Sequence, residues 1–145
     1  MTYNRPTPTG PNLHQHYVKN AVETATPLML IIMLYDEAVK MCQLAAQDMG
    51  SDNESVHNKL IKAQKIITEL TVSLNMDAGG EVAENLKSIY VYAHMRLVEA
   101  NIEKNKAKVE EVLKIMKELR EAWNIVNQEN RKNMLQQTGS ISTEA

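Results

Sequence analysis

Four stretches of the sequence repeat apolar side chains at spacings of three and four residues, and short breaks separate them. The first begins at Pro27, a residue favoured at the first helical position, with Thr26 as the expected cap, and runs to about Met49. The apolar positions of the others are 56, 60, 63, 67, 70 and 74, then 82, 86, 89, 93, 97 and 100, and then 109, 112, 116, 119, 123 and 126. Connections this short force neighbouring helices to run antiparallel. The sequence therefore predicts an all-α fold, an antiparallel up-down-up-down four-helix bundle with an N-terminal arm.

The two ends of the chain differ from the periodic stretches. Residues 1–16 include Pro6, Pro8 and Pro11 among polar side chains and show no apolar period, so we expect a flexible N-terminal arm there. Residues 17–131 form the expected bundle domain, whose last helix ends near Arg131. Residues 132–145 are expected to form a polar flexible tail.

The breaks between the stretches carry their own signals. Ser51 and Glu54 have the spacing of a capping box, which predicts that the second helix starts with Ser51 as its cap. The segment Asp77–Gly80 ends in two glycines, and we expect it to separate the second helix from the third.

Composition and charge argue against several classes of function. The chain has 145 residues and a net charge of −2, with basic and acidic residues interspersed, so we expect no nucleic-acid partner. The longest apolar run is far shorter than the roughly 20 residues that a membrane span needs. Cys42 is the single cysteine, which cannot form an internal disulfide and agrees with a reducing compartment. We therefore expect a cytoplasmic protein with no membrane insertion.

Two apolar stripes lie where the helical period places solvent. Asp36, Lys40 and Gln43 mark the polar face of the first helix, and its continuation toward the N-terminus reaches the first stripe, which consists of Met29, Ile32 and Met33. The second stripe lies opposite the core line of the third helix and consists of Val91, Met95, Val98 and Ile102. Burying one such side chain stabilises by about 1.5 to 3 kcal/mol. We therefore expect these residues to form a binding surface for a partner chain.

Contacts within the chain could also cover the stripes, in either of two ways. A cover is available just before the first helix, where Tyr17, Val18 and Val22 can form a short helical turn over the apolar surface. The stripes can also pack within the bundle, because real helices depart from an ideal helical wheel. The sequence leaves both alternatives open.

The residues that could carry chemistry do not form a site. Glu54 and His57 match the Glu-x-x-His pattern of di-metal bundles, but that class needs the pattern on two helices and only one copy is present. His94 lacks the small neighbours that would admit a phosphate donor, and Cys42 has no clear base beside it. We therefore expect no catalytic residue, no metal and no cofactor, and the protein is not expected to be an enzyme.

Several short motifs resemble one known family in their order and separation. They are Ala25-Thr26-Pro27, Met33-Leu34-Tyr35-Asp36, Ala63 to Leu70 with Ser73-Leu74, Gly79-Gly80-Glu81, Leu86, Tyr90, Arg96 to Asn101, Glu111-Val112 and Trp123. Over residues 17–131 the chain is similar to the flagellar export chaperones of the FliS family, which bind flagellin.

The resemblance implies a function and a partner. It implies a bundle whose outer apolar grooves hold the C-terminal segment of flagellin, prevent its premature polymerisation and pass it to the flagellar export gate. It also implies that the N-terminal segment lies over part of the groove when flagellin is absent. The alternative is a self-associating structural or adaptor protein, in which the same stripes join copies of the bundle.

Overall fold

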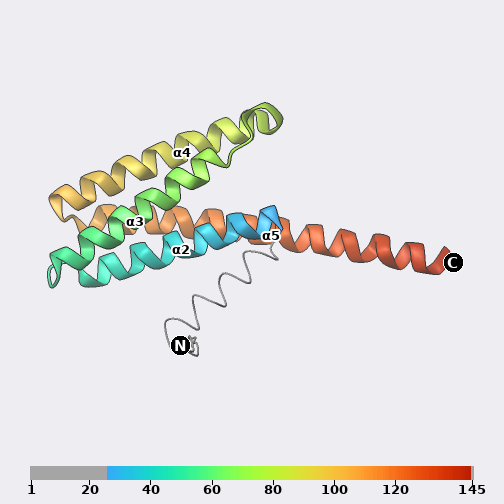
Figure 1. The fold of residues 1–145 in the computed structure, drawn as a ribbon, viewed down its shortest axis with the longest axis horizontal. Helices are drawn as coiled ribbons and strands as arrows, with labels where there is room; N and C mark the ends of the chain where they lie inside the picture. Colours follow the sequence, from blue (N-terminus) through green and yellow to red (C-terminus); the bar gives the residue numbers. More distant parts are fainter. Residues whose placement is uncertain (1–25, 145) are drawn as a thin grey trace, which may run out of the picture.

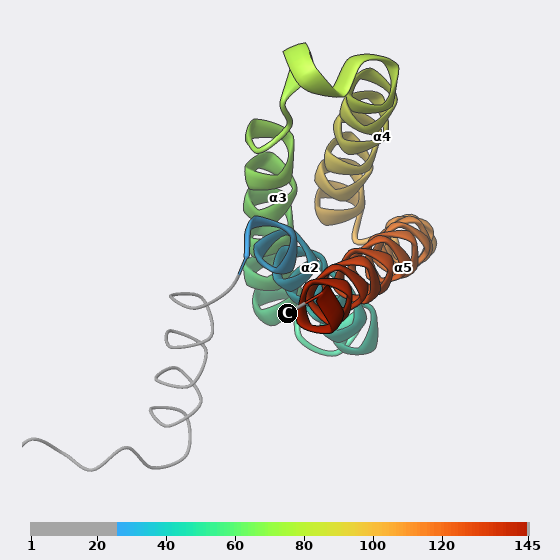
Figure 2. The ribbon, with the colours of Figure 1, turned by 90° about the vertical axis from the view of Figure 1, so that its right-hand side faces the viewer.

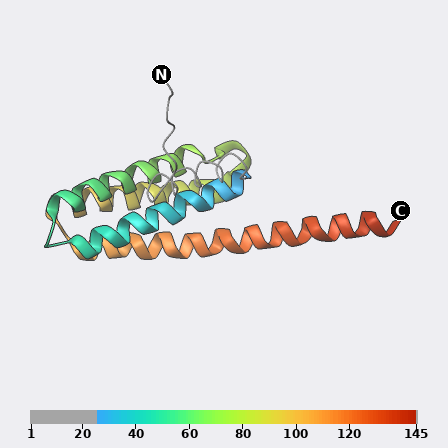
Figure 3. The ribbon, with the colours of Figure 1, turned by 60° about the horizontal axis from the view of Figure 1, so that its bottom comes forward.

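Four helices make up the described part of the chain. The computed structural model describes residues 26–144, with side-chain surroundings as far as residue 137. The helices are α2 (Pro27–Asp48), α3 (Asn53–Val72), α4 (Met76–Glu103) and α5 (Lys106–Glu144), and no strand occurs between residues 26 and 144. Figures 1 and 3 show each helix running back along the one before it. The predicted all-α four-helix bundle is confirmed, while the predicted arm at residues 1–16 lies outside the described residues.

The helices form a ring in which each packs against two others. α2 lies between α3 and α5, and α4 lies between the same two helices on the other side, as the view along the bundle in Figure 2 shows. α2 and α4 are therefore diagonal partners. A surface on the outside of α4 and a surface on the outside of α2 face away from each other.

Side-chain caps begin all four helices, and in α5 the cap is Asn105, whose side-chain oxygen accepts from the Lys108 N–H at 3.3 Å. The Thr26 hydroxyl accepts a hydrogen bond from the Met29 backbone N–H at 3.2 Å, as the sequence predicts. The cap of α3 is Asp52, whose carboxylate accepts from the Ser55 N–H at 3.0 Å, so the predicted Ser51 cap is wrong by one residue. Asp52 takes this position because the Ser51 hydroxyl donates to the Asp48 carbonyl instead.

The double glycine appears as a kink inside α4. Asn75 caps the first turn by accepting from the Ala78 N–H at 3.0 Å, and the helix then bends at Gly80, whose φ of 53° and ψ of −131° are not helical. A side chain would be strained at this φ. The bend shifts the core line by one residue, since Ala83 is buried while Val82 is 66% exposed. The sequence placed position 82 in the core, and that assignment is wrong for this reason.

The last helix is longer than the sequence indicated. α5 continues to Glu144, so the expected end of the helix near Arg131 is wrong and residues 132–144 are helical. Residues 132–137 contain neither proline nor glycine, and extending an existing helix costs far less than starting one. Figures 1 and 3 show this part of α5 projecting beyond the other three helices.

The core changes character along the bundle. Near the α2–α3 and α4–α5 connections the buried side chains are alanine, valine and leucine, at positions Ala45, Ala46, Ala100, Val56, Leu60, Val109 and Val112. Toward the α3–α4 connection the large side chains of Tyr35 and Tyr90 are buried, and Trp123 packs against them from α5. Alanines let helices approach closely, whereas rings hold them apart.

A pair of substitutions in α4 tests this assignment of core and surface. Leu97 is completely buried, so we expect Leu97→Ala to leave a cavity and lower the free energy of unfolding by about 2–5 kcal/mol. Ile102 lies five residues further along the same helix and is 79% exposed, so Ile102→Ala should change the free energy of unfolding by no more than about 0.5 kcal/mol. Urea denaturation measures both values, and equal effects would contradict the packing described.

Candidate partner-binding surface

The second apolar stripe predicted from the sequence forms the outer ridge of α4. Val91 is 47% exposed, Met95 56% and Ile102 79%, and Val98 between them is half-buried. These four residues, which we call the outer ridge, lie opposite the buried line of Ala93, Leu97 and Ala100. The structure thus places all four on one face of one helix, and three of them are about half exposed or more.

The first predicted stripe does not face solvent in the same way. Ile32 is only 5% exposed, so its predicted exposure is wrong, and Met29 and Met33 are half-buried. The reason is the position of α5. Asp36, assigned to the solvent face from the helical wheel, pairs with Arg120 of α5 at 3.5 Å, and Asn127 of α5 contacts the Met29 sulfur at 3.2 Å. Much of this stripe therefore belongs to the flank of α2 that packs beside α5.

The predicted cover of the stripes is not tested by the structure. Tyr17, Val18 and Val22 lie outside the described residues.

Three aromatic side chains from three helices form a hydrogen-bonded cluster. The Tyr35 and Tyr90 hydroxyl groups are hydrogen-bonded to each other, and the Trp123 indole N–H donates to the Tyr35 oxygen at 3.2 Å. The tyrosine rings lie 6.3 Å apart at an angle of 51°. Sequence reasoning treated Trp123 as an ordinary core residue and missed the cluster. The only signal in the sequence was that two tyrosines and one tryptophan occupy positions on the core-facing sides of three different helices.

An apolar cavity of about 340 Å³ adjoins this cluster at the end of the bundle where α3 connects to α4. We call it the end pocket. It draws its walls from α2, α4, α5 and the α3–α4 connection, and its larger side chains are those of Ile31, Leu74, Val82, Leu86, Tyr90 and Trp123. The sequence did not predict it, because its walls come from positions as far apart as 31 and 123.

A second apolar cavity lies on the α5 side of α4. It has a volume of about 380 Å³ and is lined by Ser88, Ile89, Tyr92, Ile115, Glu118 and Leu119. The ring of Tyr92 closes the end of this cavity that faces the α4–α5 connection. Beyond Tyr92 the contact between the two helices is polar instead of apolar.

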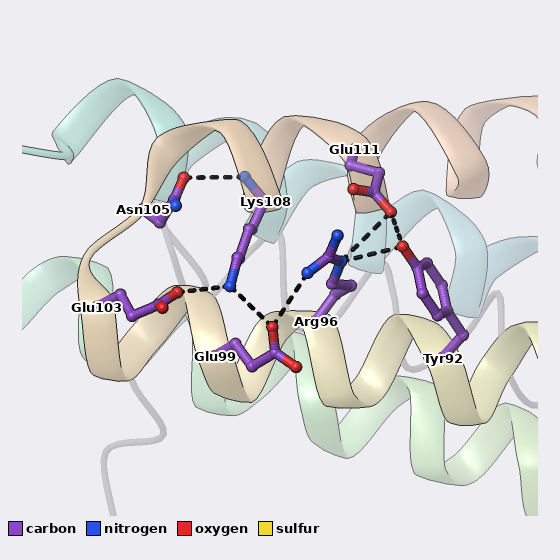
Figure 4. Close-up of polar contacts among 7 residues, drawn as sticks. All are labelled: Tyr92, Arg96, Glu99, Glu103, Asn105, Lys108 and Glu111. Carbon is purple, nitrogen blue, oxygen red and sulfur yellow. Dashed lines mark hydrogen bonds and ion pairs between the residues drawn. The ribbon is translucent and has the colours of Figure 1, made fainter.

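Arg96 is at the centre of that polar contact, which Figure 4 shows. Its Nε donates to the Tyr92 hydroxyl oxygen at 3.0 Å, and its guanidinium lies 5.5 Å from the centre of the Tyr92 ring. Tyr92 donates in turn to the Glu111 carboxylate, which also pairs with Arg96 at 3.5 Å. The Tyr92 hydrogen bond and the Arg96 charge hold the pKa of Glu111 below its usual range.

Lys108 extends the network toward the α4–α5 connection. Its ammonium group bridges Glu99 at 2.8 Å and Glu103 at 2.7 Å, and Glu99 also pairs with Arg96 at 3.1 Å (Figure 4). Hydrogen bonds from Lys108 and then Arg96 lower the pKa of Glu99, while Glu103 and Glu99 raise the pKa of Lys108. This end of α4 is therefore fastened to α5 by charges.

The network makes stability depend on pH in a defined direction. A carboxylate whose pKa is lowered in the folded state stabilises the fold above its unfolded pKa, and that contribution disappears as the pH falls through the folded pKa. For Glu99 and Glu111 this stabilisation begins to disappear as the pH falls below 4.5, the ordinary pKa of a glutamate side chain. We expect Lys108→Met to lower the Tm at pH 7 by a few degrees, and the difference from wild type to shrink steadily below pH 4.5.

Thermal melts followed by circular dichroism at several pH values measure this difference. Lys114→Met is the matched control, because Lys114 is an exposed lysine on α5 with no ion pair in the described part of the chain. A Lys108 effect that is constant from pH 7 to pH 3 would contradict an electrostatic origin.

The residues considered for chemistry are engaged elsewhere or buried. His57 Nδ1 contacts the Asn101 side-chain amide at 2.9 Å, and burial raises the pKa of the Cys42 thiol to about 12, which keeps it from forming a nucleophilic thiolate. Within residues 26–144 no three His, Cys, Asp or Glu side chains come together as a metal site. Over the same residues, no helix has the length and hydropathy that crossing a bilayer requires.

An exposed apolar ridge on a helix that also borders two apolar cavities is the kind of surface by which a helical-bundle protein binds another polypeptide. Comparison with known proteins agrees with this class. The family profile described as flagellar protein FliS matches residues 10–130, and the chain belongs to the FliS family.

Curated relatives cover most of the chain. It is 38% identical over 122 residues to the flagellar secretion chaperone FliS of Bacillus subtilis, which is 83% of this chain and 90% of the relative. The FliS chaperone of Campylobacter jejuni is 32% identical over 114 residues, covering 77% and 88% of the two chains. That of Escherichia coli is 34% identical over 110 residues, covering 73% and 79%. Membership of this family makes the chain a flagellar secretion chaperone.

Proposed function

We propose that this protein binds the C-terminal segment of flagellin in the cytoplasm, prevents its premature polymerisation and passes it to the flagellar export apparatus. The outer ridge of α4 is the observation that carries the proposal. Met95 and Ile102 present large apolar side chains that are 56% and 79% exposed, on a helix whose opposite face is fully packed. The stability of the fold does not require this ridge to be apolar.

The energetics favour a partner that folds as it binds. Covering a fully exposed side chain of this kind gains about 1.5 to 3 kcal/mol, and the partly buried ridge side chains gain a corresponding fraction of it. An amphipathic helix supplies apolar residues at the matching spacing. A disordered segment loses conformational freedom when it forms that helix, so part of the gain is offset. The covered segment is then unavailable for assembly with other flagellin molecules. Neither nucleotide nor covalent chemistry is part of this cycle.

The half-buried Met29 and Met33 form the second part of the proposed surface, whereas Ile32 does not contribute exposed area. α2 and α4 are diagonal partners in the ring, so one straight helix cannot contact both. A partner that uses both surfaces must be long and must pass around the bundle. This geometry fits an extended chain segment better than a compact domain.

We further propose that Tyr17, Val18 and Val22 cover part of the apolar surface when flagellin is absent. These residues directly precede the first turn of α2 in the sequence, and they supply apolar side chains at helical spacing. Binding of flagellin then displaces them. The cost of displacement lowers the apparent affinity, which helps the chaperone release its cargo at the export apparatus.

Isothermal titration calorimetry with a peptide spanning the flagellin C-terminal segment of the same cell tests the proposal. We expect a saturable one-to-one isotherm with a strongly negative heat-capacity change, because apolar surface is buried. Met95→Glu should weaken binding at least about tenfold without loss of helicity, since a charge would be covered by apolar contacts. Lys40→Glu adds the same side chain at an exposed position of α2 outside the stripes and should leave binding unchanged.

A different outcome would favour self-association. If the peptide does not bind and the mass of the isolated protein rises with concentration, the ridge joins copies of the bundle. Sedimentation velocity over a hundredfold range of concentration measures that mass. If Met95→Glu binds as tightly as wild type, the outer ridge is not the binding surface.

A further inference from the structure

The outer ridge contains one side chain that common oxidants attack. Three of its four residues, Val91, Val98 and Ile102, have aliphatic side chains. The fourth, Met95, has a thioether, which peroxides and hypohalous acids oxidise under conditions that leave aliphatic side chains unchanged. Met95 is 56% exposed, so these reagents reach it from solvent. The chemical state of its sulfur therefore decides whether the ridge stays apolar.

Exposure divides the methionines of the described chain into protected and reactive groups. Met116 is completely buried, and Met29 is half-buried and accepts a hydrogen bond on its sulfur from the Asn127 side-chain amide at 3.2 Å. Two methionines besides the one on the ridge are exposed, Met76 at 38% and Met134 at 67%, and neither belongs to the proposed binding surface. Oxidation of that surface therefore begins on α4.

The one thiol of the chain does not compete for the oxidant. Oxidation of a cysteine follows its thiolate character and its exposure to solvent. Cys42 is completely buried, and burial raises the pKa of its thiol to about 12, so almost no thiolate forms at neutral pH. The exposed thioethers are therefore the first sulfur atoms to react.

Oxidation turns this part of the ridge from apolar to polar. A sulfur lone pair attacks one oxygen of hydrogen peroxide, an S–O bond forms as the O–O bond breaks, and the other oxygen leaves as water. The sulfur loses two electrons and the peroxide gains them. The sulfoxide oxygen is a hydrogen-bond acceptor, and a partner that covers it with apolar side chains leaves it unsatisfied, which opposes binding.

The position of Met95 makes this change effective. It lies between Val91 and Val98 at helical spacing, so a partner helix that contacts both must also cover Met95. The opposite face of α4 holds the buried Ala93 and Leu97. Oxidation of Met95 thus alters the ridge and leaves the core of the bundle intact.

We propose that Met95 is an oxidation site through which peroxides and hypohalous acids control the binding of flagellin. The outer ridge binds the flagellin segment when Met95 is a thioether and rejects it when Met95 is a sulfoxide. A methionine sulfoxide reductase reverses the change, because a dithiol removes the oxygen as water and becomes a disulfide. This inference rests on the proposed binding of flagellin and adds a regulation of that site.

Partly oxidised wild-type protein tests the inference without a substitution. The protein is treated with dilute hydrogen peroxide, desalted, and passed over a limiting amount of immobilised peptide that spans the flagellin C-terminal segment. Mass spectrometry of tryptic fragments measures each sulfoxide in the bound and unbound fractions, and fragment 88–96 contains Met95 as its only methionine. We expect Met95 sulfoxide to be depleted from the bound fraction, Met134 sulfoxide to be equally frequent in both, and Met116 to stay reduced.

Calorimetry measures the size of the effect. Oxidised wild-type protein should bind the peptide at least about tenfold more weakly than untreated protein, and sulfoxide reductase with a dithiol should restore the affinity. Met134→Leu removes an exposed methionine outside the ridge and should lose affinity on oxidation as the wild type does. Met95→Leu should have the same affinity before and after the treatment, whatever its starting value.

The outcomes separate the two proposals. If untreated wild-type protein does not bind the peptide, the proposed function fails and this inference fails with it. If untreated protein binds and Met95 sulfoxide is equally frequent in the bound and unbound fractions, only the inference is overturned. The inference is also overturned if Met116 is oxidised as fast as Met95, or if oxidation weakens binding by Met95→Leu as much as binding by the wild type.

Discussion

The hydrogen-bonded contact of Tyr35, Tyr90 and Trp123 is the interaction that holds α2, α4 and α5 together at the end of the bundle where α3 connects to α4. Tyr35 belongs to α2, Tyr90 to α4 and Trp123 to α5, so the contact joins three helices at one level of the core. Large rings keep the helices apart, and the opening between them forms the end pocket.

The two ends of α4 are held by different forces. Near the α4–α5 connection, Arg96 and Lys108 fasten α4 to α5 through Glu99 and Glu111, and these ion pairs are exposed enough for salt and acid to weaken them. Near Gly80 the helix is kinked and borders the end pocket, and further along, at Ser88, Ile89 and Tyr92, it borders the second cavity. The outer ridge runs along the firmly held part, so a partner that lies on it meets a preorganised surface, which lowers the cost of binding.

The sequence predicted the helices well because burial repeats along each of them with helical period. The line of Val56, Leu60, Ala63, Ile67 and Leu70 in α3 is completely buried, as the spacing indicated. The prediction failed at Val82, where a glycine kink changed the phase of the helix, and at the end of α5, where no stop signal ends the helix. It failed also at Ile32, because a wheel drawn for one helix contains no information on where its neighbours lie.

The sequence by itself determined the fold class, the outer ridge on α4 and the absence of any motif for chemistry, since these follow from periodicity, charge and residue type along single helices. Only the tertiary structure decided that the stripe on α2 packs beside α5. It also decided that residues Arg96 to Asn101 join α4 to α5 and to α3. Finally, it brought three aromatic residues that are distant in the sequence together at a pocket. The physical reason is that a helical period records which side of a helix is buried. It does not record the partner that buries it, and hydrogen bonds and cavities between helices depend on that partner.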